Sequence, residues 1–159
     1  MGQNKYVTVH SFLRMGAALI AIVVFVSMFI AQQIVHSENS NLFFNWNETF
    51  FGGDWSKPAF LGFIGYIFVI LGGLAGLAFV FIDEIIGKDL TKILSYVAGA
   101  VMVVGGAMIL LNGVVFRAVN DAPGMKYYHL AAGPIVFGIL SIVAGLANAA
   151  APVLEDRGL

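Results

Sequence analysis

Three histidines are the side chains best suited to bind a metal ion or haem. His36 and His129 are expected at one depth, just beyond long apolar segments, and His10 at the opposite membrane boundary. Imidazole nitrogens are common ligands of haem iron and transition metals. No further histidine supports the pair, and the 159 residues contain no cysteine. We therefore expect no cofactor and no metal, and keep a haem-binding electron-transfer subunit as a third functional hypothesis.

Polar side chains inside the apolar segments are the other candidates, because intramembrane polar residues commonly mark functional sites. They are few, and none is charged. Without an acidic residue at mid-membrane, a proton relay or cation-coupled site lacks its usual groups. No nucleophile elbow, phosphate-binding loop, HExxH or dinucleotide glycine motif is present, so we expect no enzyme. The polar residues are Ser27, Gln32, Gln33, Tyr66, Asn112, Ser141 and Asn148.

Four long apolar segments position these residues and define the fold class. Hydrophobic residues make up 60% of the chain and charged residues 11%. Each segment has the roughly 20 apolar residues that cross about 30 Å of hydrocarbon. The sequence predicts an all-α polytopic integral membrane protein, a single domain forming a left-handed four-transmembrane-helix bundle with up-down topology. The expected spans are residues 15–35, 58–82, 93–116 and 130–153, joined by an outer loop at 36–57, an inner turn at 83–92 and an outer loop at 117–129.

The basic residues orient the chain in the membrane. Four spans place both termini on one side, and a cytoplasmic location puts five basic residues inside and three outside. This distribution follows the positive-inside rule, so we expect a multi-pass cell-membrane protein with both termini cytoplasmic. The net charge of −1 and the absence of a basic patch argue against nucleic-acid binding. The inner set is Lys5, Arg14, Lys88, Lys92 and Arg157, and the outer set is Lys57, Arg117 and Lys126.

The longer outer loop is rich in aromatic residues. Phe43, Trp46 and Phe50 are spaced to share one helix face, which predicts a short helix lying at the membrane surface. Trp55 follows after two glycines. These aromatic residues either dock a partner or lipid, or form the ordinary aromatic belt at the membrane–water boundary. The candidate outer-loop interface is Phe43, Trp46, Phe50 and Trp55.

Glycines recur at helical spacing inside three of the predicted spans. Residues seven apart stay on one helix face with a drift of about 20° per heptad. Glycine faces let helix backbones approach closely, which matters where lipid offers no hydrophobic drive for association. These faces either pack the bundle internally or hold a second copy or another membrane subunit. The candidate packing or partner residues are Gly65, Gly72, Gly76, Gly99, Gly106, Gly113, Gly138 and Gly145.

These features predict a non-enzymatic membrane protein that acts through assembly. The leading hypothesis is a small subunit, scaffold or accessory partner in a membrane complex. Its expected partners are the lipid bilayer and other membrane subunits, or a second copy of the chain. The alternative is a transporter, channel or lipid-handling subunit whose pathway forms between protomers or with a partner.

The outline of four spans with a larger first outer loop resembles that of claudin-type tetraspan proteins. Trp46 with Gly52-Gly53-Asp54-Trp55 is similar to their loop motif, a tryptophan followed by Gly-Leu-Trp. The paired cysteines of that motif are missing and the loop is short. The resemblance covers architecture only, and it carries no function to this chain.

Overall fold

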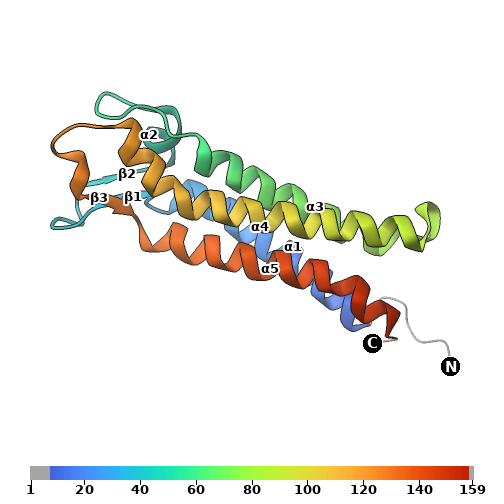
Figure 1. Ribbon diagram of the computed structural model, residues 1–159. Helices are drawn as coiled ribbons and strands as arrows, with labels where there is room; N and C mark the ends of the chain where they lie inside the picture. Colours follow the sequence, from blue (N-terminus) through green and yellow to red (C-terminus); the bar gives the residue numbers. More distant parts are fainter. Residues whose placement is uncertain (1–7, 158–159) are drawn as a thin grey trace.

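Four long helices dominate the computed structural model, which describes residues 8–157 apart from the side chains of residues 83 and 84. Each is long and apolar enough to cross a membrane, which indicates a mostly helical, multi-pass membrane protein. A helix satisfies its own backbone hydrogen bonds, as the hydrocarbon layer requires. The helices are α1 (Val9–Ile30), α3 (Leu61–Ile86), α4 (Lys88–Val119) and α5 (Ala132–Asp156) (Figure 1).

The helix bounds differ from the predicted spans because hydropathy marks the apolar part of a helix and not its ends. Helix α1 begins six residues before the span predicted at 15–35 and ends at Ile30, where Ala31 takes an extended conformation. Arg14 therefore lies inside α1, not before it. Helices α3 and α4 likewise continue into the charged turn predicted at 83–92. Lys5, one of the expected inner charges, lies outside the described residues.

The long helices pack side by side in a closed ring. Helix α1 packs against α3 and α5, and α4 packs against the same two helices, whereas α3 and α5 touch only lightly. The start of α1, the end of α5 and the α3–α4 turn lie at one end of the molecule (Figure 1). We call this the turn end. The core between the helices includes Ala21, Val24, Met28, Val69, Met102, Ile109 and Ala144.

A small sheet and a short helix cover the other end, and we call residues 31–60 and 120–131 the cap (Figure 1). Strand β1 (Ile34–His36) pairs antiparallel with both β2 (Phe43–Phe44) and β3 (Tyr128–Leu130). Strands β1 and β2 come from the first outer loop and β3 comes from the second, so the sheet joins the two loops. Helix α2 (Trp46–Phe51) follows β2, and a short 3₁₀ helix, η1 (Met125–Tyr127), precedes β3.

One face of the cap sheet packs against the helices through its apolar side chains. Successive residues of a strand point to opposite faces, and here Ile34, Phe44 and Leu130 are buried against Phe116 of α4. Phe43 alternates with Phe44 and is exposed. The predicted helix face that included Phe43 is therefore wrong, because this residue lies in β2 and the helix begins only at Trp46.

Helix α2 has a well-defined start. The Asn45 side chain accepts a hydrogen bond from the Glu48 backbone N–H at 3.1 Å, and Glu48 Oε2 accepts one from the Asn45 N–H at 3.3 Å. This reciprocal pair is a capping box, which satisfies backbone donors that a helix leaves free at its N-terminus. The box explains why so short a segment is helical at this position.

Candidate functional site

The eight candidate glycines are all buried where helices or the cap meet within the chain. A methyl group at Gly99 would lie 2.6 Å from the carbonyl oxygen of Gly145, and one at Gly106 would lie 2.6 Å from that of Gly138. Gly65 meets α4 in the same way. The remaining candidates also face this chain's own atoms: Gly72 meets Ala98 and Met102, Gly76 meets Asn148, and Gly113 meets Leu130.

In two places, adjacent glycines pack against two different neighbouring helices. Heptad spacing alone did not reveal this arrangement. Successive helical residues point about 100° apart. Gly72 accordingly faces α4 while Gly73 faces α1, and Gly106 faces α5 while Gly105 faces α3. The doubled glycines at 72–73 and 105–106 were the available signal for a helix held between two neighbours. Since the chain itself covers these glycine faces, a surface available to a partner has to be sought elsewhere on the molecule.

The four candidate outer-loop aromatic residues have very different exposures. Phe50 is fully buried and packs near Tyr66, with ring centroids 6.1 Å apart. Trp46 is half-buried, edge-on to Phe29 of α1 with centroids 5.1 Å apart. Phe43 is 45% exposed and Trp55 is 81% exposed. Phe43 and Trp55 are therefore the members of the set that a partner can reach.

A groove crosses the cap beside Trp55, and we call it the cap groove. It consists of two adjoining hollows of about 470 and 430 Å³ that share Trp55, Ala122 and Met125. Apolar atoms make up most of the exposed lining of both hollows, and the smaller one includes more charged and polar residues. The lining includes Leu42, Phe43, Phe44 and Tyr128 in the first hollow, and Asp54, Lys57 and Asp121 in the second.

Hydrogen bonds hold the two loops that form the cap groove. The Asn120 side chain at the end of α4 accepts from the Lys57 N–H at 2.5 Å and donates to the Lys57 carbonyl at 3.2 Å. On the Trp55 loop, Ser56 Oγ donates to the Glu48 carbonyl at 2.8 Å. Gly52 has φ of 81°, a conformation that favours glycine, and this lets the chain turn after α2. The loop that carries Trp55 is therefore fixed at both ends.

The cap sheet places the two candidate histidines on opposite faces. His36 is aligned with Tyr128 across β1 and β3, so His129, the next residue along β3, points to the other side. The His36 ring packs on Tyr128 with centroids 5.0 Å apart, and its Nδ1 accepts from the Glu38 N–H at 3.2 Å. The sheet does not bring the two imidazoles together around a shared metal or haem.

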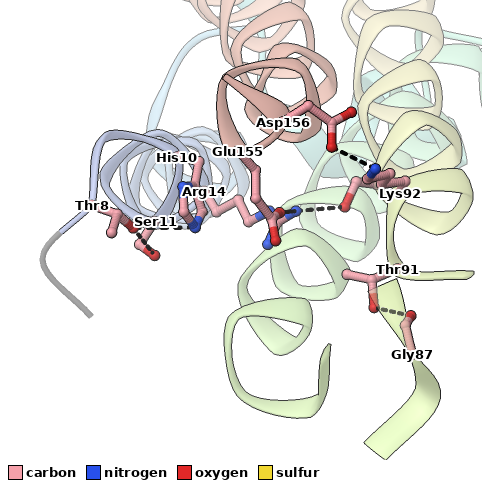
Figure 2. A network of polar contacts seen from close by, with 10 residues as sticks. Thr8, His10, Ser11, Arg14, Gly87, Thr91, Lys92, Glu155 and Asp156 are labelled. Carbon is pink, nitrogen blue, oxygen red and sulfur yellow. Dashed lines mark hydrogen bonds and ion pairs between the residues drawn. The ribbon is translucent and has the colours of Figure 1, made fainter. Parts of the chain in front are cut away.

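A buried arginine joins three helices at the turn end (Figure 2). Arg14 of α1 is 2% exposed and donates to Ser95 Oγ of α4 at 3.2 Å and to Glu155 Oε2 of α5 at 3.5 Å. Lys92 and Asp156 form a more exposed ion pair beside it. The sequence places Arg14 only one residue outside the apolar segment and gives no sign that other helices enclose it.

The chain matches no protein-family profile, no curated protein and no solved structure. The likeness to claudin-type proteins therefore stays one of outline. Among the described side chains, which leave out those of residues 83 and 84, no group of three or more histidine or acidic residues is arranged to hold a metal ion. The cap groove is the described site that best combines exposure, aromatic side chains and fixed loops.

Proposed function

We propose that this protein is a non-enzymatic accessory subunit that binds another protein of the cell membrane through its cap groove. The observation that carries the proposal is Trp55, which is 81% exposed on a fixed loop beside an aromatic groove. Tryptophan is enriched among the residues that contribute most to binding energy, and one that leaves so much apolar surface exposed is typical of such a hot spot. The charged side chains of the smaller hollow supply the polar rim that such interfaces have.

Fixed loops support binding as the role of the cap groove. Binding that must first order a loop loses part of its interaction energy to that ordering. The capping box of α2 and the amide of Asn120 order this loop within the chain itself. Because the glycine faces pack internally, the cap is also the more suitable surface for a partner than the helix faces on which sequence reasoning concentrated.

In this proposal the helices form a left-handed bundle with up-down topology, and the cap lies outside the cell. The heptad spacing of the glycines favours the left-handed crossing of about 20°. The basic residues of the turn end, including Lys88 and Lys92, favour its cytoplasmic location, and with it that of both termini.

Replacing Trp55 with alanine is expected to release the partner without unfolding the protein. An exposed side chain contributes little to folding, whereas hot-spot truncation costs about 2 kcal/mol or more of binding free energy, roughly 30-fold in affinity. The measurement is the amount of stoichiometric partner recovered with the full-length protein from native membranes in mild detergent. Ile85 at the turn end is also 81% exposed, so Ile85→Ala is the matched control. Equal recovery with both variants would refute the proposal.

A further inference from the structure

A separate groove lies between α3 and α4 on the outer surface of the helices, and we call it the span groove. It is a hollow of about 390 Å³, and the described residues that line it are all apolar. Both walls belong to helices that are long and apolar enough to cross a membrane. Leu71 of α3 and Val97 of α4 are 57% and 53% exposed at its edges. The span groove therefore opens toward the hydrocarbon layer and not toward the core.

Small residues at the contact between the two helices create the span groove. A methyl group at Gly72 would lie 2.6 Å from the carbonyl oxygen of Ala98, so the two backbones nearly touch there. Gly72, Ala75 and Ala98 all line the groove, and none of them has a side chain long enough to cover the contact from outside. The close approach that these residues permit thus leaves an unfilled hollow on the lipid side.

The dimensions of the span groove limit what can enter it. Its outermost lining residues along α3 are Phe68 and Phe79, which lie about 16 Å apart on a helix that rises 1.5 Å per residue. Spread over that length, its volume corresponds to a width of about 5 Å, whereas a helix with its side chains is about 10–12 Å across. A single extended hydrocarbon chain fits this space, and a membrane-spanning helix does not enter it.

The surroundings of the span groove supply such a chain. Apolar walls beside an empty space lose the dispersion contacts that a neighbouring molecule would give them, and an apolar hollow offers water no hydrogen bonds. Within the hydrocarbon layer the molecules at hand are lipid acyl chains. Leu94, at one end of the groove, follows Lys92 by only two residues, so the groove begins at the turn-end boundary of the span. It runs inward from there along the two helices, as an acyl chain does.

We propose that the span groove binds one acyl chain of a phospholipid from the turn-end leaflet. A chain in the groove touches α3 and α4 at once, whereas a chain on the convex surface of a single helix touches one side only. Because dispersion energy grows with the number of atom pairs in contact, the groove holds its chain in preference to the other lipid-facing surfaces. This site is independent of the cap groove and of its partner.

Photo-labelling by lipid tests the proposal on the full-length protein in nanodiscs. The probe is a phosphatidylcholine with a diazirine in the middle of one acyl chain, and mass spectrometry locates its adducts after irradiation. The matched reference for Leu71 is Val143 of α5, which is 55% exposed. Leu71 lies twelve residues before the charged turn at 83–92, and Val143 lies twelve residues before Glu155. We expect labelling of Leu71 to exceed that of Val143 several-fold, and equal labelling would overturn the proposal.

Filling the span groove is expected to remove this preference. Ala75 is half-buried in the groove, so Ala75→Leu places a side chain where the acyl chain lies. Ala78 is exposed on the same helix and does not line the groove, which makes Ala78→Leu the control. Labelling of Leu71 should fall to the level of Val143 in the first variant and stay high in the second. Unchanged labelling in an Ala75→Leu protein that melts like Ala78→Leu would contradict the proposal.

A second copy of the chain is the other occupant to test. The protein contains no cysteine, so Val97→Cys introduces a single thiol at the edge of the span groove. We expect this variant to stay monomeric on denaturing gels after mild oxidation of native membranes, because lipid covers the groove. A disulfide-linked dimer in high yield would show that another copy lies there instead, and the proposal would fail.

Discussion

Replacing Gly106 with leucine is expected to lower the melting temperature by at least about 6 °C. A single methyl group at this position would lie 2.6 Å from the Gly138 carbonyl oxygen and 3.0 Å from Ser141 Cβ, so α4 and α5 have to move apart. Overpacking a filled interior costs about 1–3 kcal/mol per substitution, and leucine against a backbone carbonyl lies at or beyond that upper value. A change of 1 kcal/mol shifts the melting temperature by about 2–4 °C at this chain length.

Gly16 provides the matched control for this substitution. It lies in the first half of α1, and a methyl group added there would meet no atom within 4 Å other than its chain neighbours and the backbone of its own helix. Leucine at Gly16 is expected to leave the melting temperature unchanged or to raise it, because glycine costs a helix about 1 kcal/mol relative to better helix formers. If both variants melted alike, the close α4–α5 contact would not contribute to stability as described.

Removing the Glu155 carboxylate is expected to destabilise the protein by about 1.5 kcal/mol. A hydrogen bond to a charged group contributes about 1.5–3 kcal/mol, and Arg14 keeps its other contacts, the bond to Ser95 among them, when this one is lost. Arg14 is 2% exposed, while the Glu155 side chain is 19% exposed. Water therefore screens part of this pair, and we expect a value at the lower limit of the range. Denaturant unfolding of Glu155→Ala measures the effect.

Asp156 lies next to Glu155 and serves as its control. Its ion pair with Lys92 is much more open, with side-chain exposures of 56% and 28%. Exposed pairs contribute about 0–1 kcal/mol, so Asp156→Ala is expected to have little effect on the unfolding free energy. A loss as large as that of Glu155→Ala would contradict the distinct role assigned to the buried pair.

The presence of the four long helices could be predicted from the sequence because uncharged apolar blocks of this length have few alternatives. Their ends could not be predicted in the same way. Arg14 reads as a boundary residue by its charge, yet it is buried in α1. It bonds Ser95 of α4 and Glu155 of α5, and hydropathy along one segment contains no information about its neighbours.

The cap sheet could not be predicted because its pairing is non-local. Ile34 pairs with Leu130, which lies 96 residues later in the chain, and each strand has only two or three residues. Strands this short show too little alternation to be recognised. Trp55 was identified from the sequence as a candidate interface residue, but the cap groove beside it depends on Asn120, which joins loops 63 residues apart.

Site-specific photo-cross-linking from position 55 in native membranes tests the central claim most directly. A photoreactive amino acid in place of Trp55 samples the contents of the cap groove, and one in place of Ile85 samples the turn end with the same exposure. We predict one adduct of discrete mass from position 55 and none of that mass from position 85. The same adduct from both positions, or no protein adduct from position 55, would contradict a partner bound in the cap groove.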